Sequence, residues 1–196
     1  MSLATALFLV SSVATGQAIR ATPGQPEART VIELMPAPAH LAVSTPAFRD
    51  GGDIPFENTQ YRSDTFPGLT WTKGPAATQT YVLIMQDSDL LAQGAPVLHW
   101  TMFNIPVDVT SLQAGMTAPP AGALYGANYK GAAQPYTGPR TPPGGKDRYH
   151  FEIFALDATL TADAGTSYAA LTRAMSGHVI ASGEVVGLGE KDPSAP

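Results

Sequence analysis

Two neighbouring segments in the middle of the chain are almost continuously apolar. Residues 80–87, TYVLIMQD, and residues 99–105, HWTMFNI, are rich in β-forming side chains, and Pro106 ends the second segment. A continuous apolar run of this length is typical of a strand that is buried on both faces. We therefore expect these two segments at the centre of a sheet.

Shorter patterns predict the elements around this centre. Residues 166–175 show helical spacing of Tyr168, Leu171 and Met175, with Thr166 as the predicted N-cap and Gly177 at the end. A long stretch from 110 to 146 is rich in Gly, Pro and Ala, and loops of such length are usually functional or disordered. Further strands are predicted over residues 41–48, 68–72, 148–157 and 178–188.

The N-terminal region has a different pattern. Residues 1–18 carry no charge, have an apolar centre and end Gly16-Gln17-Ala18, which resembles a signal peptide without a basic start. A buried or frayed N-terminal helix is the alternative, and the apolar segment is too short to span a bilayer comfortably. The Pro-rich segment that follows is expected to be an arm with one edge strand at Val31–Met35. The expected organisation is a signal peptide (1–18), an arm (19–40), one domain (41–188) and a tail (189–196).

Composition narrows the fold and the partners. The chain has 196 residues with 19 glycines and 18 prolines, and only 14% of its residues are charged, which favours a loop-rich, mostly β domain. The net charge is −5 and no basic run occurs, so nucleic acid is not an expected partner. Because the chain has no cysteine, disulfides, thiol nucleophiles and Cys-based zinc sites are excluded.

Polar residues gather between the two central segments. Asp87, Asp89 and His99 would converge at one edge of the sheet if Asp87 ends one strand and His99 begins the next. Two carboxylates at i and i+2 share a face of an extended chain, and their repulsion raises one pKa, as an acid and base pair requires. A polar turn is an equally good interpretation, and a mixed oxygen and nitrogen metal site is chemically allowed.

Other enzyme signatures are missing from the sequence. No G-x-S-x-G elbow, phosphate-binding loop or dinucleotide fingerprint occurs. Among common enzyme chemistries, only an acid and base reaction at the carboxylates and His99 remains. His40 in the arm and His178 beside Gly177 are interpreted as structural.

An ordered series of motifs links these features. The series contains STPAF, GDIP, LTW, a D-x-D motif, HW with NIP, YTGPRTPPGG, RYHFEIFALD and SGHVIASGEVVG, and it runs from about Leu41 to Leu188. In this series the chain resembles the phosphatidylethanolamine-binding proteins, and within them the bacterial Raf-kinase-inhibitor-like proteins. The resemblance implies a large central β-sheet with a smaller flanking sheet and short peripheral helices. It also implies a small pocket for phosphate-like or carboxylate groups.

The resemblance also assigns ligand-binding residues. Two departures from the family pattern stand out: Ser88 replaces a proline, and Asp147 replaces a ligand-facing histidine. His150 cannot substitute for that histidine, because alternate residues of a strand face opposite sides. The implied site consists of Asp87, Asp89, His99, Gly138, Pro139, Asp147 and Tyr149.

The extra carboxylate changes what the pocket is expected to bind. Three converging aspartates repel a dianion, so either Arg140 or Arg148 turns inward, or the site prefers a zwitterion, an amine or a neutral ligand. The same carboxylates are expected to raise the pKa of His99 and keep it protonated.

The resulting functional hypothesis is a non-catalytic binding protein for a small polar or anionic ligand or a lipid head group. No cofactor or metal and no transmembrane segment are expected. A surface that inhibits a protease or kinase is the first alternative, and a hydrolase or isomerase using Asp87 and His99 is the second. The location is expected to be periplasmic or secreted, or cytoplasmic if no signal peptide is present. The oligomeric state stays open, with a homodimer allowed.

Overall fold

A computed structural model describes residues 17–22 and 24–196, so most of the expected signal peptide lies outside the described residues. The fold is mostly β, as predicted, with one large and one small sheet. The strands are β1 (Ile19–Arg20), β2 (Ala39–His40), β3 (Val43–Ser44), β4 (Gly52–Asp53), β5 (Leu69–Trp71), β6 (Thr80–Ala92), β7 (Ala95–Pro106), β8 (Ser111–Leu112), β9 (Leu124–Tyr125), β10 (Asp147–Leu156) and β11 (Val179–Gly189). The helices are α1 (Val31–Leu34), α2 (Tyr168–Met175) and the 3-10 turns η1 (Pro26–Ala28) and η2 (Phe56–Asn58).

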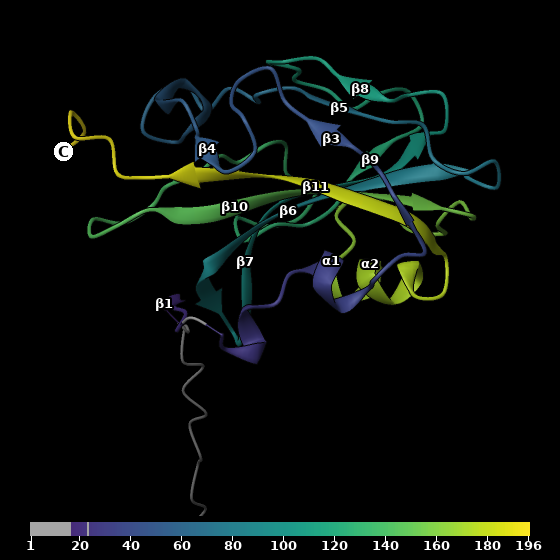
Figure 1. The fold of residues 1–196 in the computed structure, drawn as a ribbon, viewed down its shortest axis with the longest axis horizontal. Helices are drawn as coiled ribbons and strands as arrows, with labels where there is room; N and C mark the ends of the chain where they lie inside the picture. The colour runs from purple at the N-terminus through teal and green to yellow at the C-terminus, as the bar shows by residue number, and fades with distance from the viewer. Residues whose placement is uncertain (1–16, 23) are drawn as a thin grey trace, which may run out of the picture.

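The molecule has three layers. The large sheet has the order β2-β11-β10-β6-β7-β9, with β1 added to β6 and β4 to β11, and the small sheet has the order β3-β5-β8. Figure 1 shows the small sheet on one side of the large sheet and the two α-helices on the other. The central strands are therefore buried on both faces, which explains their continuous apolar sequence.

Strand alternation divides the core into two clusters. Along β6, Leu83 and Met85 pack toward the small sheet, whereas Val82 and Ile84 pack toward the helices. The same alternation along β10 separates Tyr149 from its neighbours in sequence. Residues next to each other in these strands therefore belong to different faces of the sheet.

The two central strands form one long hairpin, which corrects the predicted boundaries. Asp87 does not end β6, because the strand continues to Ala92 and turns through Gln93 and Gly94. Both turn residues have positive φ values, 54° and 79°, as a two-residue hairpin turn requires. The chain reverses here with no separate loop between the two strands.

The arm contains a helix where an edge strand was expected. Residues 31–34 form α1, and the capping box of Thr30 and Glu33 stabilises its first turn. The apolar run was too short to distinguish strand from helix by pattern alone. In α2 the cap is Ser167, one residue after the predicted Thr166, and Gly177 follows the helix with a φ of 83°.

The loop from 110 to 146 contains the short strands β8 and β9 and then leads into the start of β10. No helix among the described residues is long and apolar enough to cross a membrane.

Candidate functional site

Pairing of β6 with β10 brings the predicted site residues together. Asp87 lies opposite Tyr149 in this pairing, and Asp147 is two residues before Tyr149 on the same strand. All three side chains are fully buried, and His99 from β7 is 4% exposed. We call Asp87, His99, Thr141, Asp147 and Tyr149 the strand-end cluster.

In the part of the chain that the structure describes, only one of the two carboxylate oxygens of Asp87 has hydrogen-bond partners, and these come from its own strand. Its Oδ1 accepts hydrogen bonds from the backbone N–H groups of Asp89 (2.9 Å) and Leu90 (3.1 Å), as the polar-turn interpretation predicted. Its Oδ2 is buried and has no hydrogen-bond partner among the described residues. Burial, and then the negative charge of Asp147, raise the pKa of Asp87 to about 7. The repelling carboxylate is thus Asp147, whereas Asp89 was the expected one.

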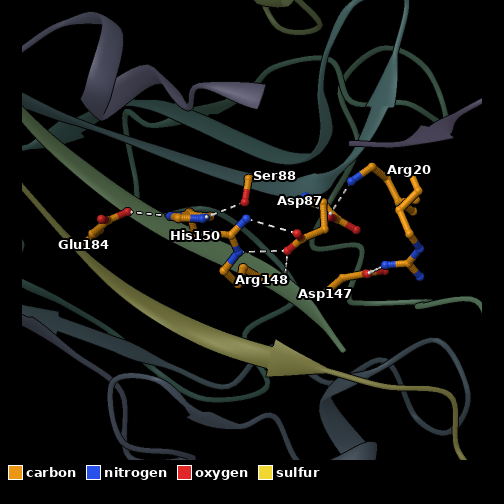
Figure 2. Close-up of polar contacts among 9 residues, drawn as sticks. Arg20, Asp87, Ser88, Asp147, Arg148, His150 and Glu184 are labelled. Atoms are coloured by element: carbon orange, nitrogen blue, oxygen red, sulfur yellow. Dashed lines mark hydrogen bonds and ion pairs between the residues drawn. The ribbon is translucent and has the colours of Figure 1, made fainter. Parts of the chain in front are cut away.

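Asp147 receives its counter-charge from the N-terminal arm. The Arg20 guanidinium donates to Oδ1 of Asp147, and Oδ2 has no partner among the described residues (Figure 2). Burial raises the pKa of Asp147, although Arg20 opposes this shift. Arg20 reaches this position because β1 pairs with residues Leu90 and Leu91 of β6.

The two arginines expected to compensate Asp147 lie elsewhere. Arg148 donates to both oxygens of Asp89, from Nε at 2.9 Å and from a terminal nitrogen at 3.0 Å. Burial opposes ionisation of Asp89, but this bidentate pair outweighs it and lowers the Asp89 pKa. Arg140 lies over the ring of Tyr61, with the guanidinium carbon 5.3 Å from the ring centre. Neither arginine turns inward, so of the two alternatives only the other one is left, a site that prefers a zwitterion, an amine or a neutral ligand.

His99 enters the cluster through a bulge in β7. Register shifts between Met85 and Gln86 leave His99 as an extra residue in the ladder. Its ring lies at 5.1 Å from the Tyr149 ring, edge to face. Nδ1 lies 3.0 Å from the carbonyl oxygen of Thr137, so this nitrogen carries the proton and donates.

The prediction that His99 is protonated is wrong, because the side chain is buried. Enclosure of the imidazole lowers the pKa of His99 to about 4, because the charged form loses its hydration. Positive charge on Lys130 acts in the same direction, and the carboxylates of the cluster do not compensate. His99 is neutral at neutral pH and supplies no cation to a ligand.

Gly138 and Pro139 lie between Thr137 and Thr141, which contact His99 and Tyr149 of the cluster. The Gly138 N–H donates to Asp64 (2.7 Å), and its carbonyl oxygen accepts from Gln60 (2.6 Å). A Cβ at position 138 would lie 2.4 Å from the carbonyl oxygen of Asn58, so only glycine fits. Pro139 accepts a hydrogen bond from the Gln60 N–H at 2.9 Å.

Arg20 and Thr141 are site residues that the sequence analysis missed. The Thr141 hydroxyl lies 2.9 Å from the Tyr149 hydroxyl, and Thr141 is fully buried. Arg20 comes from the arm, to which no chemistry was assigned, and no local pattern marks it. Within the described part of the chain, no three His, Asp or Glu side chains group as a metal site would require.

Comparisons with known proteins show the family of the chain. The model of the phosphatidylethanolamine-binding protein family matches residues 44–190. The chain belongs to this family. A UPF0098 protein of Methanothermobacter thermautotrophicus is 36% identical over 151 residues, covering 76% of this chain and 97% of its own.

Solved structures support the same assignment. A homologue of phosphatidylethanolamine-binding protein from Chlamydia trachomatis has a TM-score of 0.70 at 30% identity, covering 78% of this chain and 99% of its own. YbcL of E. coli has a TM-score of 0.70 at 26% identity, covering 79% of this chain and all of its own. Both the family and the mostly β fold predicted from the motif series are confirmed.

Proposed function

We propose that this chain binds a small polar ligand at the strand-end cluster, and that the ligand presents an ammonium or another donor group to Asp87 and Asp147. The ion pair between the Arg20 guanidinium and the buried Asp147 carries this proposal. The Arg20 guanidinium occupies the position at Asp147 where the ammonium group of a ligand would bind.

The charges of the cluster favour a donor over an anion. Two buried carboxylates each keep one oxygen without a partner, and His99 is neutral near pH 7. A free phosphate would meet repulsion at short range in a poorly hydrated site. A zwitterion such as phosphoethanolamine could direct its ammonium group to the carboxylates and its phosphate outward.

Ligand entry would require Arg20 to leave Asp147. Strand β1 is only two residues long, and one further hydrogen bond joins Ala21 to the Asp89 carbonyl oxygen. The Arg20 side chain is 43% exposed, so its pair with Asp147 is partly screened by water. Exchange of this side chain for a ligand ammonium is therefore energetically modest.

Titration calorimetry tests the proposal with four probes: phosphoethanolamine, ethanolamine, phosphate and acetate. The two amines are expected to bind, and phosphate and acetate are not. Asp147→Asn should weaken ethanolamine binding by about tenfold or more, since it removes the charged acceptor. The matched control is Asp53→Asn, an exposed aspartate paired with Lys146, which should leave binding unchanged. Absence of heat with both amines, or equal binding by Asp147→Asn, contradicts the proposal.

We also propose that the chain acts outside the cytoplasm after removal of residues 1–18. Support comes from the apolar N-terminal pattern and from the candidate lipoprotein LppC of Mycobacterium tuberculosis, which is 33% identical over 155 residues. Cleavage after Ala18 would keep Ile19 and Arg20, and therefore β1. Intact mass spectrometry of the protein from cell fractions should give a chain that begins at Ile19 outside the cytoplasm. A full-length chain confined to the cytosol would contradict this location.

A further inference from the structure

A second polar cluster lies on the opposite face of the large sheet. Ser88, His150 and Glu184 come from β6, β10 and β11, and their side chains form a row in Figure 2. The Ser88 hydroxyl oxygen lies 3.0 Å from Nε2 of His150, and Nδ1 of His150 lies 2.8 Å from a Glu184 carboxylate oxygen. The strand-end cluster does not contain any of these residues.

The hydrogen bonds fix the roles of the two imidazole nitrogens. A carboxylate can only accept, so Nδ1 of neutral His150 carries the proton and donates to Glu184. Nε2 is then unprotonated and accepts from the Ser88 hydroxyl. Nucleophile, base and orienting acid in this order are the arrangement by which a serine hydroxyl is activated.

A cavity of about 570 Å³ opens over this row. Its floor includes Ser88, Arg148 and His150, and its wall is formed by residues of the arm between 24 and 33. Ser88 is 4% exposed, and its remaining surface faces this cavity. The volume suits a small molecule, and its limited size, with a lining that is polar and apolar in about equal parts, favours a short acyl chain over a long one.

We propose that Ser88 is a nucleophile that hydrolyses short-chain carboxylic esters, with His150 as general base and Glu184 as the positioning residue. This proposal is independent of the proposed binding function, because the two clusters face opposite sides of the sheet. Ser88 Oγ attacks the ester carbonyl carbon while its proton passes to Nε2 of His150. The C–O bond to the alcohol breaks, and the alcohol leaves with that proton. Water, deprotonated by His150, then attacks the acyl carbon; the bond to Ser88 Oγ breaks, the acid leaves, and the proton on His150 returns to Oγ.

Two arginines, Arg29 and Arg148, also line the cavity. Arg148 is held by both oxygens of Asp89, whereas Arg29 donates from Nε to the Pro26 carbonyl oxygen at 3.2 Å. The outer nitrogens of Arg29 remain as donors on the cavity wall.

The first test is covalent labelling of the full chain with an alkyl fluorophosphonate, followed by peptide mapping. One adduct per chain on the peptide that contains Ser88 is expected. This mapping uses the unmodified protein, so it does not depend on whether a variant folds. No adduct, or an adduct on another residue, overturns the proposal.

The second test is hydrolysis of p-nitrophenyl acetate by variants of matched melting temperature. Ser88→Ala and His150→Gln should each lower kcat on the order of 100-fold or more. Glu184→Gln should lower kcat with KM unchanged, a split that a purely structural role would not produce. The controls are Ser182→Ala, another buried strand serine, and His178→Gln, a histidine paired with Asp157 at 2.8 Å. Equal hydrolysis by Ser88→Ala and the parent chain overturns the proposal.

Discussion

At the scale of single residues, Asp147, which stands where the motif resemblance led us to expect a histidine, is paired with Arg20. The two residues are 127 positions apart, and they meet only because β1 adds to β6. From the sequence, either Arg140 or Arg148 was expected to compensate the extra carboxylate, or the ligand preference was expected to change; in the structure the cation is Arg20. Which arginine supplies the charge depends on the path of the arm, and no residue pattern encodes that path.

A double-mutant cycle measures the interaction free energy between Arg20 and Asp147. Arg20→Met removes the charge and keeps most of the aliphatic stem, so it should lower the free energy of unfolding by roughly 1–2 kcal/mol. The value is moderate because Arg20 is 43% exposed and Asp147 is buried. In the Asp147→Asn background, the same substitution should cost much less, since no buried charge is left unpaired.

Lys146→Met is the control for this cycle, because Lys146 and its partner Asp53 are both exposed. Urea unfolding should show a change within about 0.5 kcal/mol for this variant. Equal losses from Arg20→Met in both backgrounds would mean that the ion pair does not stabilise the fold.

At the scale of elements, α1 depends on two buried polar side chains of the sheet. It is only four residues long, too short to be stable alone. The Val31 N–H donates to the Gln86 side chain at 2.9 Å, and the Ile32 N–H donates to Glu152 at 3.0 Å. The sheet therefore caps the helix, and this explains why an apolar run that resembled an edge strand folds as a helix.

Gln86→Leu should release the start of α1. The substitution leaves the Val31 N–H buried without an acceptor, so the free energy of unfolding should fall by about 1–3 kcal/mol. Hydrogen exchange should accelerate at Val31 and Ile32 and remain unchanged in the distant helix α2. Unchanged exchange at Val31 would contradict the role of Gln86 as a cap.

At the scale of the whole molecule, the large sheet separates two polar sites. Asp87 and Tyr149 face the small sheet, whereas their sequence neighbours Ser88 and His150 face the arm. Apolar periodicity and the motif series predicted the central strands, the fold class and most of the strand-end cluster. The polar row on the other face, Ser88, His150 and Glu184, was not predicted. It has no local motif and depends on the register of three strands.

The long hairpin shows the same limit. The stretch from Asp87 to His99 contains no polar break strong enough to set strand ends, and Gln93-Gly94 is not one of the dipeptides that mark a two-residue hairpin turn. Residues 88–90 of β6 have no partner in β7, and His99 is an extra residue in β7. These irregularities orient the functional side chains, and they follow from packing across strands.

Burial of ionisable groups on both faces predicts how stability depends on pH. Burial raises the pKa of Asp87 to about 7 and the pKa of Glu152 to about 8 in the folded state. An acid with a raised folded pKa stabilises the fold fully below its unfolded pKa and loses this contribution as pH rises through the folded value. His99, with its pKa lowered to about 4, contributes in the opposite direction, but only between about pH 4 and 6.5.

Between pH 6.5 and pH 8 the contribution of His99 is complete, so the two carboxyl groups dominate. The free energy of unfolding should fall across this window on the order of 1–3 kcal/mol. The variant Asp87→Asn with Glu152→Gln should show little change, because each amide resembles the neutral acid and keeps an oxygen for the backbone N–H groups. Urea unfolding at pH 6.5 and pH 8.0 measures both proteins. An equal fall in the parent chain and the double variant would show that other groups control the pH dependence.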